Sequence, residues 1–362
     1  MENCRFYVLQ PEAGQTLLQQ ADDLLRQMEN LFKAGECSLD ALLQMRIYVT
    51  DAANQCADLR AHRLVTDFSG LGVVSFVEQP PLGGGKLAVL LWFVAGEVEG
   101  REVRQLPDGQ CVRLTADGLT YLLQTVRWTE GNIPETPELQ TRQAFQSHEA
   151  QLRSLGLNLR DHCQRTWIYV RDVDNQYAEV VKARNEVFSQ CGLTPEAHFI
   201  ASTGIGGASE CTKAAVAMDF FSVGGLPAES VSYLHALDYL NPTHEYGVAF
   251  ERGTRLSLPR EQLYLISGTA SIDHTGACVH RGDVLTQAGR LFLNIEKLLQ
   301  SGGASLADVP YFVVYLRDVA DKAAVLRYLR LRFPDVSCLV VSGRVCRPEW
   351  LIEVECMAVK AC

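Results

Sequence analysis

The sequence lacks a hydrophobic run long enough to cross a membrane. No stretch approaches the twenty consecutive apolar residues that a membrane-spanning helix needs. The opening residues, Met1-Glu2-Asn3-Cys4-Arg5, also lack the apolar core of a secretory signal. We therefore expect a soluble, cytoplasmic protein with no membrane partner.

Closely spaced cysteine pairs are missing as well. The twelve cysteines are scattered singly between Cys4 and Cys362, with no CxxC pair and no metal-type His/Cys spacing. Asp273, His274 and His280 resemble a metal set only superficially, because a turn and a helix start explain them without a ligand role. We expect mostly buried thiols, no metal and no cofactor.

Clusters of basic residues are the third absence. The formal net charge is −10, and no arginine-rich stripe is present that would neutralise a phosphate backbone. Nucleic acid is therefore excluded as an expected partner. A local pair of arginines can still bind a small carboxylate, because bidentate hydrogen bonds outweigh a net field that salt screens within about 8–10 Å.

A repeated unit is the main feature that the sequence does have. The chain has 362 residues, of which 47% are hydrophobic and 21% charged, enough for two or three ordinary cores. In each unit an amphipathic helix ends near a glycine, and a short loop leads to a strand with the pattern Tyr-x-x-Asp. The pattern occurs at Tyr48–Asp51, Tyr169–Asp172 and Tyr315–Asp318. We predict three modules, residues 1–113, 114–228 and 229–362, divided at turn sequences.

The aspartate of each pattern is predicted to cap a second helix, where its side chain can accept hydrogen bonds from the first turn. A Gly-rich or polar connection and an apolar strand should follow that helix. The expected strands are residues 87–94, 214–221 and 350–359. Gly204–Gly207 is interpreted as part of a flexible connection, because a strand rather than a helix comes next.

The third module is the most regular. We predict a strand at Gln262–Ile266, a helix with an apolar stripe from Val284 to Leu299, and a helix at Lys322–Arg332. In the final strand, alternation puts the apolar positions toward the module's own helices. Glu353 and Glu355 share the opposite face, so Glu353 points either to solvent or into a cleft between modules.

Several segments of this module resemble the reactive-intermediate deaminase family, YjgF/RidA. They are Ile266-Ser267-Gly268, the helix with Gly282-Asp283, Gln287 and Asn294-Ile295, Phe333-Pro334, and Leu351-Ile352-Glu353-Val354-Glu355. The resemblance implies an α+β, chorismate-mutase-like fold whose members form trimers with active sites between subunits. Three tandem RidA-like modules would form a pseudo-trimer within one chain, as a monomer or a homo-oligomer.

A more specific resemblance covers roughly the last two modules and is to the chorismatases, which remove pyruvate from chorismate. It is carried by Arg165-Thr166-Trp167-x-Tyr169, Tyr177 with Arg184, Ser202–Gly206, Tyr246-Gly247 with Phe250-x-Arg252, Ser267–Ile272, and Val345–Pro348 ahead of Glu353. Two departures, a shorter Tyr246–Phe250 loop without prolines and Ile168 in place of a common asparagine, leave the substrate or the product open.

The chemistry of such a reaction defines the candidate site. Chorismate has two carboxylates and an enol ether, so its cleavage needs cationic groups and an acid for the vinyl carbon. Glu353 is the predicted general acid, because apolar neighbours raise a carboxyl pKa. Arg347 and Arg252 are the predicted carboxylate clamps.

Further substrate-binding residues follow from the resemblance. It implies orienting roles for Tyr246, Tyr177 and Arg184, and includes Thr269 in a matching segment. Cys346 is interpreted as lining of the pocket, since no His lies nearby to activate its thiol. Each residue also has an ordinary structural interpretation; Arg184, for example, could pair with Glu179 or Glu186 on its helix.

Three alternative functions remain. An imine or enamine deaminase of the RidA type depends on an arginine just after Phe-Pro, and that position is Val336 here. A non-catalytic ligand-binding or assembly protein is favoured if Glu353 faces bulk water. Ribonuclease activity ranks last because of the acidic charge. For a chorismatase-like site the product stays open between a dihydroxy-cyclohexadiene acid and a hydroxybenzoate.

Overall fold

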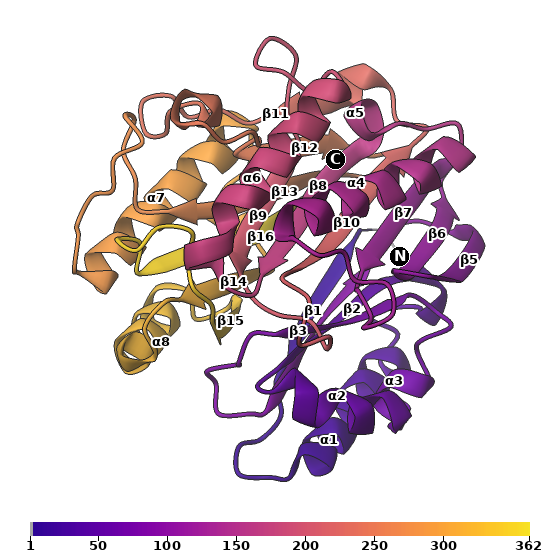
Figure 1. Ribbon diagram of the computed structural model, residues 1–362. Helices are drawn as coiled ribbons and strands as arrows, with labels where there is room; N and C mark the ends of the chain where they lie inside the picture. The colour runs from indigo at the N-terminus through magenta and orange to yellow at the C-terminus, as the bar shows by residue number, and fades with distance from the viewer. Residues whose placement is uncertain (1–2) are drawn as a thin grey trace.

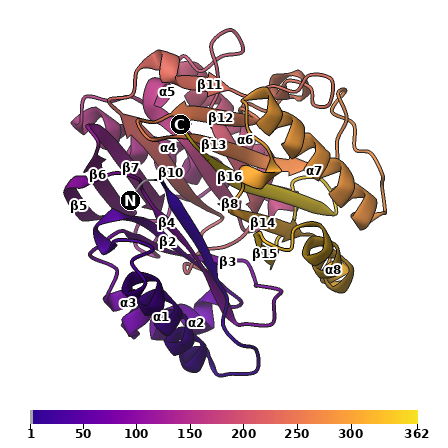
Figure 2. The same ribbon diagram turned by 180° about the vertical axis from the view of Figure 1, so that it is seen from behind.

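Three β-sheets face one another around a shared interior, and the helices cover their outer faces (Figures 1 and 2). The computed structural model describes residues 3–362, except for the side chain of Tyr246. The predicted α+β fold of three tandem modules in a pseudo-trimer is confirmed. Within the described residues, no helix is long and apolar enough to cross a membrane.

The first sheet has four strands in the order β1-β4-β2-β3. Its strands are β1 (Arg5–Leu9), β2 (Leu42–Val49), β3 (Val73–Glu78) and β4 (Leu87–Phe93). Its helices are α1 (Leu17–Lys33), α2 (Ala52–Ala61) and α3 (Arg63–Thr66), with a 3₁₀ turn η1 (Leu39–Ala41). Thr16 and Gln19 form a capping box at the start of α1.

The second sheet has six strands in the order β5-β6-β7-β10-β8-β9. They are β5 (Val98–Leu106), β6 (Gly109–Ala116), β7 (Leu119–Val126), β8 (Cys163–Val170), β9 (Ala201–Gly206) and β10 (Val216–Gly224). Its helices are α4 (Pro137–Ser154), α5 (Leu159–His162) and α6 (Val173–Gln190).

The third sheet has six strands in the order β11-β12-β13-β16-β14-β15. They are β11 (Val231–Tyr233), β12 (Gly253–Ser257), β13 (Glu261–Ala270), β14 (Tyr311–Leu316), β15 (Ser337–Ser342) and β16 (Ile352–Ala361). Its helices are α7 (Val284–Ser301) and α8 (Lys322–Arg332), with 3₁₀ turns η2 (Ala228–Ser230), η3 (Thr243–Tyr246), η4 (Leu306–Asp308) and η5 (Val319–Asp321). The predicted elements of the third module are confirmed, and α8 matches its predicted bounds.

Two local predictions need correction. Asp51 and Asp318 cap the elements that follow them, but Asp172 makes no side-chain capping hydrogen bond at α6. Its carboxylate accepts a hydrogen bond from Asn175 instead. Gly204 and Gly206 are not a flexible connection, since both lie in β9, a buried strand that pairs in parallel with β8.

The predicted domain boundaries stay predictions. The position at residue 113 falls inside β6, which pairs with β7 of the second sheet, and that sheet already begins with β5 at Val98. The position at residue 228 falls at the start of η2, ahead of the third sheet. All twelve cysteines are free, and six of them are buried.

Strand registers make the modules comparable residue by residue. The tyrosine of each repeat pairs with one residue of its module's last long strand, in the pairs Tyr48–Ala88, Tyr169–Ala217 and Tyr315–Glu353. Two residues earlier, the pairs are Arg46–Leu90, Trp167–Asp219 and Val313–Glu355. Directly paired residues lie on the same face of a sheet. Ala88, Ala217 and Glu353 are therefore equivalent, as are Leu90, Asp219 and Glu355.

Candidate active site

A small cavity between the second and third modules collects most of the predicted site residues. Its volume is about 50 Å³, and its walls come from α6, β9, β13, β16 and three loops. The lining residues are Tyr177, Arg184, Ser202, Gly204, Val248, Phe250, Arg252, Gly268, Ala270, Ile272, Cys346, Arg347, Trp350 and Glu353. Six of the eight candidates thus lie together, although they are up to 176 positions apart in the chain (Tyr177 to Glu353).

Glu353 is buried at the wall of this cavity, with 4% of its surface exposed. Of the two orientations left open by the strand pattern, it adopts the one between modules. Its carboxyl group makes no hydrogen bond to another described residue. Burial raises the pKa of Glu353 to about 8, with a further rise from the charge of Glu355, while Arg165 and Arg252 oppose it. The group is therefore mostly protonated at neutral pH.

Gly268 lets Glu353 adopt this position. A Cβ atom on Gly268 would overlap Oε1 of Glu353 and would lie 3.1 Å from Cγ2 of Thr203. Any larger residue would push the carboxyl group away. The Ser267-Gly268 sequence therefore has a steric role at the site.

Arg184 brings to the same cavity a guanidinium group that has no counterion among the described residues. Its residue is 1% exposed, and its Nε and Nη2 atoms have no hydrogen-bond partner among the described residues. The alternative of a pair with Glu186 is wrong, because Glu186 pairs with Arg142 at 2.6 Å. A buried cation of this kind is costly unless an anion binds to it. Arg184 is thus suited to hold a substrate carboxylate.

Arg252 and Arg347 line the cavity from two loops. Arg252 is 6% exposed and donates to the backbone oxygen of Asn241 at 3.1 Å. Its guanidinium also lies 5.4 Å from the ring centre of Phe250. The guanidinium of Arg347 stacks 5.1 Å from the ring of Trp350. Aromatic rings thus orient both cations beside the cavity.

Tyr177 and Cys346 also line the cavity. The thiol of Cys346 donates to the backbone oxygen of Gly204 at 2.8 Å, and burial raises its pKa to about 12. Such a thiol is a poor nucleophile at neutral pH. Burial also raises the pKa of Tyr177, whose hydroxyl would lie 2.6 Å from a Cβ atom on Gly204. A glycine at 204 therefore leaves room for the Tyr177 ring.

The two remaining candidates differ from these six. Thr269 does not line the cavity, because its hydroxyl donates to the backbone oxygen of Ser267 at 2.9 Å. The side chain of Tyr246 lies outside the described residues. Its backbone ends η3, in the segment that runs from Asn241 to Phe250.

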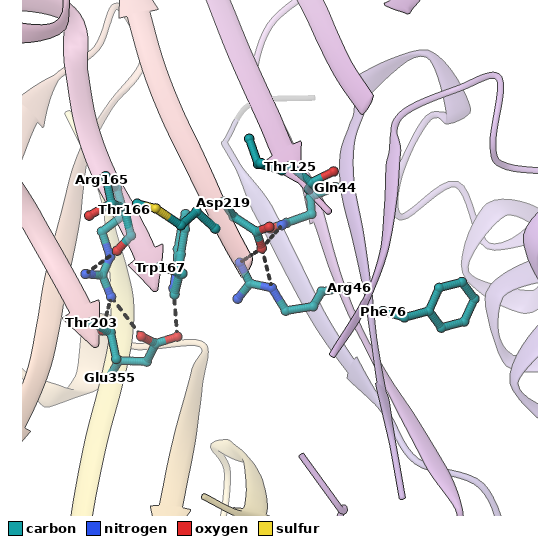
Figure 3. A network of polar contacts seen from close by, with 12 residues as sticks. Gln44, Arg46, Phe76, Thr125, Arg165, Thr166, Trp167, Thr203, Asp219 and Glu355 are labelled. Atoms are coloured by element: carbon teal, nitrogen blue, oxygen red, sulfur yellow. Dashed lines mark hydrogen bonds and ion pairs between the residues drawn. The ribbon is translucent and has the colours of Figure 1, made fainter. Parts of the chain in front are cut away.

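Two residues beyond Glu353 on β16, Glu355 belongs to a charged network that the sequence did not reveal (Figure 3). Glu355 accepts from Arg165 Nη2 at 2.8 Å and from the indole Nε1 of Trp167 at 2.9 Å. Arg165 also donates to Thr203 Oγ1 at 2.6 Å. The shared face of Glu353 and Glu355 in a two-residue alternation was the one signal for it.

A second cavity adjoins the first. Its volume is about 260 Å³, and it shares Phe250 and Arg252 with the smaller one. Small-molecule pockets commonly measure about 300–1,000 Å³. The two cavities together approach that range, and both are lined by Phe250 and Arg252.

Metal ligation finds no support in the described residues. Between residues 3 and 362, apart from the side chain of Tyr246, no three His, Cys, Asp or Glu residues are grouped so that they could hold an ion. Asp273 accepts hydrogen bonds from Thr275 and Ala277 in a turn.

The family model matches the third module, and the sequence relatives match stretches of about the same length. The family described as Endoribonuclease L-PSP matches residues 254–360. The 3-aminoacrylate deaminase RutC of Acinetobacter baylyi is 29% identical over 102 residues, 27% of this chain and 79% of the relative. A RutC family protein of Pyrococcus abyssi is 33% identical over 97 residues, 26% of this chain and 76% of the relative.

A solved structure matches the whole chain. The crystal structure of a chorismatase aligns with a TM-score of 0.69 over 99% of both chains, at 19% sequence identity. At this identity the likeness shows a shared fold. The arrangement of all three modules is therefore common to both proteins.

Proposed function

This chain belongs to the RidA/YjgF/RutC family, and on that premise we propose that it cleaves the enolpyruvyl ether of chorismate, or of a related carboxylated metabolite, and releases pyruvate. The observation that carries the proposal is the pairing of two buried groups in one cavity. One is Glu353, protonated at neutral pH, and the other is Arg184, a guanidinium that lacks a partner among the described residues. The whole-chain fold shared with a chorismatase supports the same reaction class.

Proton transfer from Glu353 begins the proposed reaction. The carboxyl proton moves to the terminal vinyl carbon, and the ether carbon becomes an oxocarbenium-like cation. The carboxylate left on Glu353 stabilises this cation. Water then adds to the cationic carbon and returns one proton to Glu353, and the resulting hemiketal breaks into pyruvate and the ring alcohol. Glu353 thus acts as an acid and is regenerated.

Arginines fix the orientation of the substrate in this scheme. Arg184 binds one carboxylate, since it lines the cavity and two of its buried nitrogens have no hydrogen-bond partner among the described residues. Arg252 and Arg347, held over Phe250 and Trp350, contact the other. A planar guanidinium binds a carboxylate at two points and so sets the position of the vinyl group.

Substrate binding must widen the cavity, because about 50 Å³ is too small for a dicarboxylate of the size of chorismate. We expect the segment from Asn241 to Phe250 to move and to join the cavity to its 260 Å³ neighbour. One hydrogen bond, from Asn185 to the backbone oxygen of Gly247 at 3.1 Å, ties the middle of this segment to α6. The ring product follows from which nucleophile reaches the cation, water or a ring hydroxyl.

The deaminase alternative has support from the names of the relatives but less from the residues. Val336 stands where that reaction requires an arginine, and it lines other cavities, away from Glu353. The non-catalytic alternative depends on a solvent-facing Glu353, which is instead buried. Both functions still enter the test as outcomes.

Incubation with chorismate tests the proposal. Pyruvate formation and loss of the diene absorbance are followed for the wild type, for Glu353→Gln, and for Glu210→Gln as a matched control. Wild type and the control should release pyruvate, and Glu353→Gln should be slower by about 10²–10⁴-fold. If the wild type releases no pyruvate but releases ammonia from an enamine, the deaminase function replaces the proposed one.

A further inference from the structure

We propose that Glu355 is a positioning residue for Glu353: its buried carboxylate, fixed by Arg165 and Trp167, keeps Glu353 in its proton-carrying form at neutral pH. This inference rests on the proposed function, because it concerns the acid of that reaction. It assigns a role to a charge that does not touch the cavity.

Strand geometry gives Glu355 its influence. The two glutamates lie two residues apart on one face of β16, which separates their Cα atoms by about 7 Å. Both are nearly inaccessible to solvent, so little water screens their interaction. A fixed negative charge at this distance disfavours a second one on Glu353.

The Glu355 carboxylate is held in place by two donors of the neighbouring module. Arg165 Nη2 lies 2.8 Å from Oε2, and Trp167 Nε1 donates to Oε1 at 2.9 Å (Figure 3). Each oxygen therefore has a directed partner, and the carboxylate cannot rotate toward Glu353. Charge-assisted hydrogen bonds of this kind are the strong ones in proteins.

The same network reaches the wall against which Glu353 lies. Thr203 Oγ1 accepts from Arg165 at 2.6 Å and from the backbone N–H of Gly268 at 2.9 Å. Gly268 in turn is in close contact with Glu353. Glu355 thus affects Glu353 both through its charge and through the position of the β13 backbone.

Other charged and titratable groups also surround Glu353. Among them, Arg165 and Arg252 lower its pKa and so oppose the effect of Glu355. The groups are Arg165 of β8, Tyr177 and Arg184 of α6, Arg252 ahead of β12, Tyr315 of β14, and Cys346 and Arg347 of the loop before β16. The tyrosines and the thiol stay neutral, because burial raises their pKa values. Glu355, which pairs with Arg165, is therefore the carboxylate that acts on Glu353 against these arginines.

Equivalent positions in the other modules show what is specific here. Asp219 occupies the place of Glu355 in β10, but Ala217 stands where Glu353 would be. In β4 both places are apolar, with Leu90 and Ala88. Two consecutive inward carboxyl groups occur only in β16 among the three described strands.

A charge cycle tests the proposal on the intact protein. The titration of the Glu353 carboxyl carbon is followed by NMR, with the signal assigned by its loss in Glu353→Gln. In Glu355→Gln we expect the pKa of Glu353 to fall by about one unit or more, because a like charge is lost and Arg165 remains. In the double variant Glu355→Gln/Arg165→Met we expect it to return toward the wild-type value. The double variant also guards against unfolding, since neither charge is left buried alone.

The pH dependence of pyruvate release gives the second measurement. The alkaline decline of the rate should move to lower pH in Glu355→Gln and back in the double variant. A uniform loss of rate at every pH, with an unmoved Glu353 titration, would show that Glu355 is only structural and would overturn the proposal. The NMR titration needs no substrate, so a wild type that fails to cleave chorismate refutes the proposed function separately.

Discussion

The cleft between the second and third modules and its equivalent between the first and second use matching strand positions but hold different groups. In the cleft between the second and third modules, strand β16 carries Glu353 and Glu355. In the cleft between the first and second modules, strand β10 carries Ala217 and Asp219 at the same positions. In the cleft between the second and third modules, two nitrogens of Arg184 lack a hydrogen-bond partner among the described residues. In the cleft between the first and second modules, Arg60 is bound to Glu210 at 2.7 Å.

Charge balance distinguishes the two clefts further. Asp219 accepts from Arg46 at 2.9 Å and lies 2.8 Å from Arg127 Nη2, as the right-hand part of the network in Figure 3 shows for Arg46. Arg127 also donates to the backbone oxygen of Met218 at 3.0 Å and lines a cavity of about 250 Å³. Asp219 thus forms ion pairs with two arginines, whereas Glu353 has no ion pair among the described residues.

The third cleft, between the third module and the first, has Leu90 and Val313 at the interior positions that hold charges elsewhere. Polar groups also meet there, because Glu261 accepts from the backbone N–H of Cys4 at 2.8 Å, and Gln10 and Arg330 line its cavity beside Leu329 and Val340. Under the proposed function, one of the three clefts carries out the chemistry. A pseudo-trimer in one chain allows this division, which identical subunits cannot achieve.

The largest expected difference between the clefts is in the rate of cleavage. Glu353→Gln removes the proton donor and should lower the rate by about 10²–10⁴-fold. Glu210→Gln, in the loop of the other cleft, should leave the rate within about twofold, because its pair with Arg60 is exposed. Steady-state pyruvate release measures both. Equal losses in the two variants would remove the distinction between the clefts.

Stability should depend most on the charge-balanced cleft. Asp219→Asn leaves Arg46 and Arg127 without their shared carboxylate and should lower the free energy of unfolding by about 3–5 kcal/mol. Asp40→Asn, whose carboxylate is exposed, should change it by less than about 0.5 kcal/mol. Urea denaturation followed by fluorescence gives both values. A small loss in Asp219→Asn would mean that this pair does not hold the modules together.

Substitution of Arg184 should weaken substrate binding, whereas substitution of Arg60 should not. Arg184→Met removes charged hydrogen bonds to the substrate, worth about 1.5–3 kcal/mol, and should lower kcat/KM by about 10- to 100-fold. Arg60→Met in the equivalent cleft should leave kcat/KM unchanged. A matching loss in Arg60→Met would place substrate in both clefts.

The response of cleavage to pH should come from the cleft between the second and third modules. The folded pKa of Glu353, about 8, is raised from the ordinary value of 4.5, so its protonated form contributes stability below pH 4.5 that is lost as pH rises through 8. Cleavage should fall about tenfold per pH unit above 8, since the acid is then ionised. Glu353→Gln should also gain stability relative to the wild type between pH 5 and 8. Parallel stability curves for the two proteins would contradict the raised pKa.

The smallest expected effect comes from a single methyl group. Gly268→Ala should push the Glu353 carboxyl out of place and lower the rate by about tenfold. Gly289→Ala in α7, where the nearest atom to a new Cβ is 4.0 Å away, should leave the rate unchanged and raise the stability by about 0.5–1 kcal/mol. Rates and melting temperatures of the two variants check this pair.

The repeat and the alternation of β16 predicted the module fold and that Glu353 points away from its own module's helices, because both depend on local periodicity, but they left open whether it faces solvent or a neighbouring module. They did not predict that Gly204 lies in a strand, since a glycine-rich segment becomes a strand only when a neighbouring strand pairs with it. Nor did they reveal the link from Glu355 to Arg165, which joins residues 190 positions apart. Such contacts follow from how the modules meet, and no single module encodes them.

Crystals of Glu353→Gln soaked with chorismate test the central claim most directly, because the variant binds without turnover. The account predicts density for the ligand in the cleft between the second and third modules alone, with one carboxylate on Arg184 and the vinyl carbon facing residue 353. Ligand in the cleft beside Asp219, or a vinyl group facing away from residue 353, would contradict it.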